Sequence, residues 1–278
     1  MLRRLLRVAF RAAVVVVAAT LLGTWFGPRP SNDRDWTPDQ ERLAWAQITG
    51  DEVVVHNVRN ARYRSEHDFD VAWENRTYRL DALERVWFLV EPFDTDWRGP
   101  AHTLLSFEFQ GGRFLAISFE IRKEEGESFS VWKGILRQYE LMVVVGDERD
   151  LIELRTSHRR DTVHLYPMRA SPATARLLLV GLLERANRLR DQPEFYNTFT
   201  NSCTTNLARS VNQLAPGRVP LWHPRVLLPG YSDRLAYGLD LIDTALPFAE
   251  AQRHFRVDDN GQAATGREDF SRAIRQGL

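Results

Sequence analysis

The chain has one cysteine, Cys203, and the residues around it suit a nucleophile. Polar residues precede it over 196–202, and Leu207, Val211 and Leu214 follow it at helical spacing. This pattern predicts that Cys203 lies in the first turn of an amphipathic helix. There, unpaired backbone N–H groups and the positive end of the helix dipole favour the thiolate, the reactive form of cysteine. The alternative is a small buried apolar side chain, which is common for a free cysteine.

A histidine and a carboxylate suited to such a thiol lie on a predicted hairpin of two strands, 102–109 and 113–122. A three-residue turn between them makes residues of equal parity share a face, and the odd-numbered residues are mostly apolar. The pairs expected in this register are Phe109 with Arg113, Glu108 with Phe114, and Ser106 with Ala116. Counting outward puts His102 directly opposite Glu120, with Cβ atoms about 5 Å apart.

These three side chains are the predicted catalytic residues of a thiol enzyme. The imidazole of His102 accepts the proton of Cys203, and the carboxylate of Glu120 orients the ring and stabilises imidazolium. The alternative is that His102 and Glu120 form a solvated cross-strand pair with no catalytic role.

Four further residues are candidates for binding substrate or supporting the site. Arg122, on the polar face of the hairpin, is expected to bind a carboxylate or a lipid phosphate, or to form a structural salt bridge. Asn201 is expected to cap the cysteine helix or to contribute to an oxyanion site beside the backbone N–H of the cysteine. Tyr139, which precedes a buried strand, and Ser118, on the polar face, are expected to support the site.

The elements that must position these residues predict an α+β architecture. Besides the hairpin, the predicted strands are 52–58, 69–80, 85–90, 141–145 and 162–165. A helix from Pro172 to about Arg190 follows, and then the cysteine helix. We expect an antiparallel sheet packed on helices.

The first 30 residues predict a membrane anchor. Residues 1–11 carry four arginines and no acid, and 12–26 are free of charge up to Pro28 and Pro30. We expect an uncleaved single-pass anchor with the body outside the cytoplasm, and a cleaved signal peptide is the alternative. The resulting division is 1–30 for the anchor, 31–40 for a polar linker, 41–250 for the enzyme-like domain, and 251–278 for a tail. Within this tail, 257–267 is expected to be loose and 268–275 to form a short helix.

Composition and missing motifs exclude several classes of function. The net charge of zero provides no basic field for nucleic acid, and 44% hydrophobic residues allow a sizeable core. The sequence contains no HxxxH or CxxC pattern and no glycine-rich phosphate loop, so neither a metal nor a cofactor is expected. Ser106 and Ser118 lie in no GxSxG elbow. Nothing in the sequence indicates an oligomeric state.

Several short motifs occur in one order along residues 36–243: Asn57-Val-Arg-Asn60, Ala101-His-Thr103, Ile117-Ser-Phe-Glu-Ile-Arg122, Gln138-Tyr-Glu-Leu141, Gly146-Asp-Glu-Arg-Asp150, Leu165-Tyr-Pro167 and Thr200-Asn-Ser-Cys-Thr-Thr-Asn206. In these motifs the chain resembles the family known as the Lnb N-terminal periplasmic domain. The order of strand histidine, polar residue on the next strand and later helix-start cysteine is similar to that of circularly permuted papain-like enzymes of the NlpC/P60 superfamily.

The resemblance implies thiol-dependent acyl transfer at the membrane surface through a thioester on Cys203, because Lnb members are associated with lipoprotein N-acylation. The resemblance also implies a body in the bacterial periplasm on a single-pass inner-membrane anchor. Expected partners are the membrane and a lipid or lipoprotein substrate. Lnb proteins carry further transmembrane helices after this domain, whereas the segment 235–248 is only partly apolar here. The chain could therefore use another acyl donor or acceptor, or hydrolyse an acyl or amide bond instead. Two alternatives are a papain-like amidase acting on cell-wall peptides and a non-catalytic envelope protein that binds or assembles.

Overall fold

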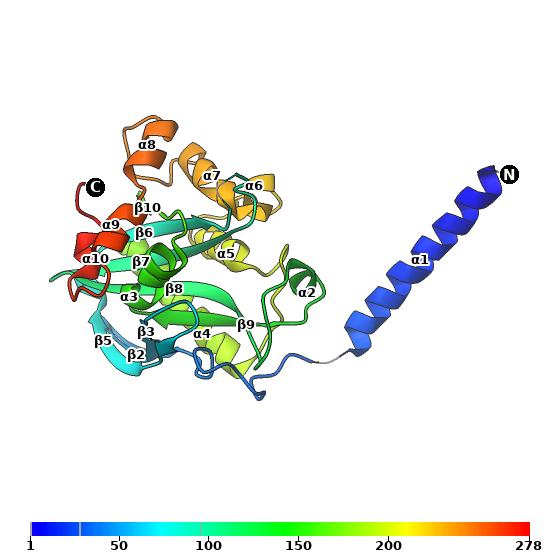
Figure 1. Cartoon of the computed structure of the whole chain (residues 1–278), viewed down its shortest axis with the longest axis horizontal. Coiled ribbons are helices and arrows are strands. Elements are labelled where there is room, and N and C mark those ends of the chain that lie inside the picture. The colour runs from blue at the N-terminus through cyan, green and yellow to red at the C-terminus, as the bar shows by residue number, and fades with distance from the viewer. Residues whose placement is uncertain (1, 28, 95) are drawn as a thin grey trace. The chain divides into compact units, whose positions relative to one another are not determined.

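The computed structural model describes residues 2–27, 29–94 and 96–278, which divide into two compact units (Figure 1). The first unit, Met1–Ser31, contains helix α1 (Leu2–Phe26). Over the described residues, none of the helices is both long and apolar enough to cross a membrane. The anchor expected over residues 1–30 stays a prediction, and Pro28, expected to help end it, lies outside the described residues.

The second unit, Asn32–Leu278, is built on a sheet of eight strands among the described residues. Across the sheet the order is β1, β2, β9, β8, β7, β6 and β10, and β5 pairs with β2. Adjacent strands are antiparallel, except that β2 and β9 meet in parallel at Arg59 and Gly146. The strands are β1 (Trp45–Thr49), β2 (Glu52–Arg59), β3 (Arg62–Tyr63), β4 (Phe69–Asp70), β5 (Trp73–Arg79), β6 (Leu83–Pro92), β7 (Ala101–Phe109), β8 (Arg113–Arg122), β9 (Glu140–Gly146) and β10 (His164–Pro167).

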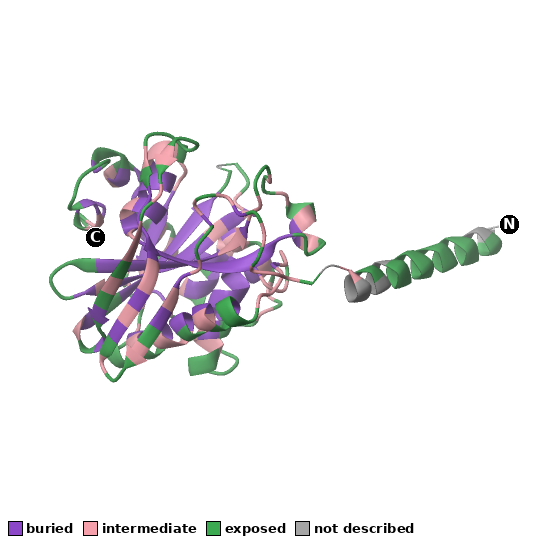
Figure 2. Cartoon of the chain, turned by 90° about the horizontal axis from the view of Figure 1, so that it is seen from below, coloured by how far each residue is buried: buried purple, intermediate pink, exposed green. Residues whose placement is uncertain are grey.

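Helices cover both faces of this sheet. The cluster with α4 and α5 takes the odd-numbered residues of the hairpin, such as Leu105 and Ile117, and the cluster with α3 and α10 takes even-numbered ones, such as Leu104. The remaining elements of the body are η1 (Leu80–Ala82), α2 (Val131–Ile135), α3 (Glu148–Leu151), the π-helical turn η2 (Leu154–Arg159), α4 (Pro172–Asp191), α5 (Cys203–Leu214), α6 (Pro224–Leu227), η3 (Pro229–Tyr231), α7 (Ser232–Gly238), α8 (Phe248–His254), α9 (Asp258–Ala263) and α10 (Phe270–Ala273). Figure 2 shows the central strands buried between these layers.

The α+β architecture and the register of the hairpin are confirmed. In β7 and β8, Phe109 lies opposite Arg113, Glu108 opposite Phe114 and Ser106 opposite Ala116. Gly111 and Gly112 in the turn have φ angles of 78° and 70°, a region in which residues other than glycine are strained.

The open end of the hairpin differs from the prediction. Pairing of β7 with β8 ends at Leu104 and Ser118, so His102 and Glu120 are not partners in the ladder. Beyond this point each strand follows its other neighbour, since His102 pairs with Glu91 of β6 and Glu120 with Met142 of β9. The two strands of the hairpin are therefore not held together by backbone hydrogen bonds at the level of His102.

Two segments expected to be loose belong to the compact unit. In the expected linker, Trp36 is buried, and its neighbour Thr37 donates a backbone hydrogen bond to Lys123. In the part of the tail expected to be loose, Val257 and Ala264 are buried in the cluster that covers the even-numbered face. In both segments the few apolar residues are spread among polar ones, so the sequence shows no single amphipathic pattern there.

Two strand predictions also change. The strand predicted over 69–80 is divided into β4, which pairs with β3 in a separate ribbon, and β5, which joins the main sheet. The edge strand β1 was not predicted. Its pairing with β2 follows from the tight turn at Gly50, which has a φ of 59°.

We predict that Phe270→Ala lowers the free energy of unfolding by about 3–5 kcal/mol, because it leaves a cavity in a fully buried site. Urea denaturation of the full chain measures this loss. Phe129→Ala, at a side chain that is 50% exposed, is the matched control and should change stability by less than about 1 kcal/mol. Equal effects of the two changes would mean that the C-terminal helices do not contribute to the core.

Candidate active site

Cys203 is the first residue of α5, as predicted, and it is 5% exposed. The residue that caps the helix is Ser202, not Asn201. The Ser202 hydroxyl accepts a hydrogen bond from the Thr205 N–H, and the Thr205 hydroxyl accepts one from the Ser202 N–H. The short hydroxyl side chain directly before the helix reaches its third amide, which completes a capping box and fixes the start of the helix.

Asn201 instead holds the turn that leads into α5. Its Nδ2 donates to the carboxylate of Glu194 and to the backbone carbonyl of Phe195, and its Oδ1 accepts from Nδ2 of Asn206. Both ends of the amide are therefore engaged with the chain around the start of the cysteine helix.

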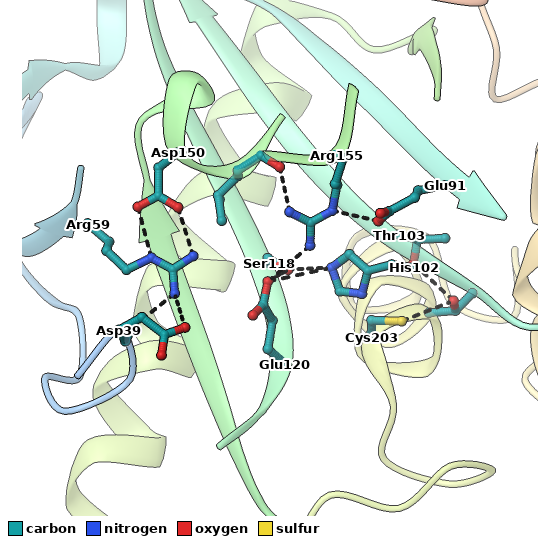
Figure 3. A network of polar contacts seen from close by, with 12 residues as sticks. Asp39, Arg59, Glu91, His102, Thr103, Ser118, Glu120, Asp150, Arg155 and Cys203 are labelled. Carbon is teal, nitrogen blue, oxygen red and sulfur yellow. Dashed lines mark hydrogen bonds and ion pairs between the residues drawn. The ribbon is translucent and has the colours of Figure 1, made fainter. Parts of the chain in front are cut away.

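His102 contacts Glu120 mainly through Ser118. Nε2 of His102 lies 2.6 Å from Oγ of Ser118, which lies 2.9 Å from Oε1 of Glu120. The direct distance from Nε2 to the Glu120 carboxylate is 3.8 Å. The structure therefore brings His102, Ser118 and Glu120 together, with the hydroxyl placed between the ring and the carboxylate (Figure 3).

The direction of these hydrogen bonds defines the tautomer of His102. Ser118 has one hydroxyl proton and donates it to Glu120, so its oxygen accepts from Nε2–H of the imidazole. Nδ1 then carries the free lone pair and is the basic nitrogen. In the view of Figure 3, the sulfur of Cys203 lies on the Nδ1 side of the ring.

A buried pair of threonines connects the cysteine helix to the histidine strand. The hydroxyl of Thr103, next to His102, lies 2.9 Å from the hydroxyl of Thr204, next to Cys203. The Thr204 oxygen is also 3.7 Å from Sγ of Cys203. Among the described residues, no hydrogen bond joins Sγ to the imidazole itself, so the two are brought near each other through their neighbours in sequence.

Arg155 and Glu91 complete the polar cluster, and sequence reasoning missed both. Nε of Arg155 lies 2.5 Å from Oε2 of Glu91, and Nη2 lies 3.4 Å from Oε1 of Glu120. Nη1 donates to the carbonyl of Leu151. One signal was available, because Glu91 directly continues the apolar run 86–90, and a carboxylate at the end of a buried strand requires a cationic partner.

These charges change the titration of the site. Burial, and then the positive charge of Arg155, lower the pKa of His102 to about 3 against the opposing effect of Glu120. Burial alone would raise the pKa of Glu120, but Arg155, His102 and Arg59 outweigh it and lower that pKa to about 2. At neutral pH the imidazole is therefore uncharged and the Glu120 carboxylate is ionised.

A second buried ion pair lies beside this cluster (Figure 3). Arg59 donates from Nε and Nη2 to the two carboxylate oxygens of Asp150, at 2.9 and 2.8 Å. Its Nη1 donates to the backbone carbonyl of Asp39. This bidentate geometry ties β2 to α3 and to the segment that precedes β1.

The surroundings of Arg122 and Tyr139 indicate packing roles. Arg122 is 2% exposed, donates to the backbone carbonyls of Gln40 and Glu41, and stacks over the ring of Trp36. No free face is left for a lipid phosphate, so substrate binding by Arg122 has no support here. Tyr139 is fully buried, and its hydroxyl donates to the carbonyl of Ser128.

The arrangement provides an uncharged imidazole that can take part in proton transfer. The ring can accept a proton at Nδ1, and the resulting imidazolium would face Ser118 and the ionised Glu120. Within the described ranges, no group of three histidine, cysteine or acidic side chains lies close enough together to hold a metal ion.

The fold and the site define an α+β domain with cysteine and histidine near one end of its sheet. The model of the family called Lnb N-terminal periplasmic domain matches residues 69–230, more than half of the chain. The chain therefore belongs to this family, which confirms the resemblance found in the sequence. The matched range contains Glu91, His102, Arg155 and Cys203. Comparisons with curated proteins and with solved structures return no match.

We predict that Thr103 and Thr204 are energetically coupled. Thr103→Val or Thr204→Val alone leaves one buried hydroxyl without its partner and should lower the free energy of unfolding by about 1–3 kcal/mol. The double variant removes both hydroxyls and should cost less than the sum of the two. A double-mutant cycle from denaturation midpoints measures the difference, and strictly additive losses would contradict the coupling.

Proposed function

We propose that the protein is an extracytoplasmic thiol acyltransferase or hydrolase that acts through Cys203, His102 and Glu120. The observation that carries this proposal is the hydrogen-bonded order of Glu120, Ser118 and His102, which leaves the lone pair of Nδ1 available to accept a proton. The Thr103–Thr204 bond supports it, because it fixes the start of that helix against the histidine strand.

The reaction proceeds in two halves. Nδ1 of His102 accepts the Sγ proton while the sulfur of Cys203 bonds to a substrate carbonyl carbon, and backbone N–H groups at the start of α5 stabilise the oxyanion. The tetrahedral intermediate then expels an alcohol or amine, which takes the proton from Nδ1 and leaves a thioester. An acceptor amine or water next gives its proton to Nδ1, attacks the thioester and releases the thiol.

The fold proposed for this chemistry is circularly permuted papain-like, of the NlpC/P60 type. Its support is the order along the chain, with the histidine on β7, the polar residues on β8 and the cysteine at the start of the later α5. In this arrangement the nucleophile helix packs on the strand of the base. Helix α5 packs on the odd-numbered residues of β7, and its Thr204 contacts Thr103, the neighbour of His102.

We further propose that α1 anchors the protein in the bacterial inner membrane and that its substrates are lipid-linked, for example lipoproteins. The support is the row of four arginines before an uncharged stretch. Membership of a periplasmic-domain family agrees with a body in the periplasm. An anchor of this kind would keep the site near acyl chains.

One observation favours a second candidate, a non-catalytic envelope protein. Cys203 is only 5% exposed, as expected of a structural cysteine. The two candidates differ in whether the thiol of the folded protein reacts and in whether that reactivity requires His102.

The experiment is alkylation of Cys203 by iodoacetamide in the full chain. The acyltransferase proposal predicts reaction at pH 7, with the rate reduced about 10²-fold in His102→Ala because the general base is lost. His164→Ala is the matched control, since His164 is also buried but contacts Gln252 rather than the site. A thiol that reacts only after unfolding would sink the proposal and support the non-catalytic candidate.

The same measurement gives a pH dependence with a defined sign. The base must be uncharged, and the pKa of His102 is lowered to about 3, so its contribution persists at pH 5 and disappears only as pH falls toward 3. An unperturbed histidine would lose that contribution near pH 6.5. The contribution is the difference between the rates of the wild type and His102→Ala. A decline of this difference centred near pH 6.5 would show that the imidazole is not held in the buried, cation-flanked setting.

A further inference from the structure

Arg155 bridges the two strands on either side of the strand that carries His102. Its guanidinium contacts Glu91 on β6 through Nε and Glu120 on β8 through Nη2, at 2.5 and 3.4 Å. His102 lies on β7, between these two strands in the order of the sheet. The guanidinium is 5% exposed, so both contacts are shielded from water.

The bridge lies where the backbone ladder is missing. Hydrogen bonding between β7 and β8 ends at Leu104 and Ser118, so no backbone pair sets the distance from His102 to Glu120. Ser118 connects them only if Glu120 is ionised and correctly placed, because the hydroxyl needs an acceptor. Nη2 of Arg155 contacts the same oxygen of Glu120, Oε1, that accepts from Ser118, so the guanidinium can hold this acceptor in place.

The anchorage of Arg155 is itself rigid. The carbonyl of Leu151, one helical turn earlier, accepts from Nη1, and Glu91 is fully buried. The side chain is thus oriented by two fixed acceptors and presents its remaining edge to Glu120. A flexible surface arginine could not set the position of a carboxylate in this way.

We propose that Arg155 is a positioning residue of the site: it holds Glu120 as an ionised acceptor and thereby fixes Ser118 and the Nε2–H tautomer of His102. The inference rests on the proposed function, because the tautomer matters only if Nδ1 serves as the base for Cys203. Arg155 touches no reacting atom and acts through Glu120 and Ser118.

The charged groups that face this cluster come from several elements. Arg159 faces both His102 and Glu91, Asp161 faces Glu91, and Arg59 faces Glu120. Burial raises the pKa of Glu91 to about 7, and Arg155 opposes that rise. Glu91 therefore gains a proton near neutrality, so a test of Arg155 must separate its effect from that of Glu91.

The test is a ¹⁵N NMR titration of the histidine rings in the full chain. We expect the wild type to show His102 as the Nε2–H tautomer down to the lowest pH at which the protein stays folded. In Arg155→Met the loss of the neighbouring cation should raise the pKa of His102 by about 1–3 units and allow a mixture of tautomers. Arg155→Lys keeps the charge, so it should restore most of the low pKa but not the fixed tautomer.

A second variant covers the case in which Arg155→Met fails to fold because Glu91 is left buried without a partner. Arg155→Met combined with Glu91→Gln removes both charges, and Glu91→Gln alone gives the contribution of Glu91. Arg275→Met is the matched control, since Arg275 is 8% exposed and pairs with Glu148 in the same layer but does not contact Glu120.

The outcomes are distinct. The positioning role is overturned if the folded double variant shows the same His102 pKa and tautomer as Glu91→Gln alone. It is also overturned if Arg275→Met changes the His102 pKa and tautomer as much as Arg155→Met does. Alkylation of Cys203 is not part of this readout. An inert thiol would therefore reject the proposed function while the NMR result still reported on what Arg155 does to His102.

Discussion

A charged side chain buried between a sheet and its covering helices needs a partner of opposite charge in direct contact. In this site Arg155 and its two carboxylate partners meet that requirement. Its guanidinium is shared by carboxylates from β6 and β8, so two strands and the turn η2 are fixed relative to one another. Burial, and then the positive charge of Arg155, keep His102 neutral, and Arg155 is the main cause that keeps Glu120 ionised. The second pair, Arg59 with Asp150, extends the same compensation toward β2.

The features that could be predicted from sequence are local. The parity of the hairpin follows from one three-residue turn, and the helix start at Cys203 follows from polar residues before an apolar repeat. The contacts of His102 could not be predicted, because they depend on the point at which β7 and β8 separate. The ladder between β7 and β8 ends before His102, so Ser118 takes the place beside the ring that direct pairing gave to Glu120. Arg155 comes from a turn outside the hairpin, and no spacing rule connects it to His102.

The family match and the structure divide the molecule differently. Residues 69–230 include every side chain of the cluster around His102, together with the helix of Cys203. The C-terminal helices lie beyond that range, yet they cover the same face of the sheet as α3. There Arg275 pairs with Glu148 of α3. In this chain the layer of helices on that face of the sheet therefore comes partly from outside the matched range.

The near-complete burial of the only cysteine also has a chemical consequence in an oxidising compartment. A periplasmic thiol is exposed to disulfide exchange and to stepwise oxidation to sulfenic and sulfonic acids, and both depend on access to sulfur. With no second cysteine in the chain, Cys203 has no internal thiol to resolve a sulfenic acid. Its 5% exposure restricts the approach of bulky disulfide-bonded proteins, so a mixed disulfide forms less readily at Cys203 than at an exposed thiol.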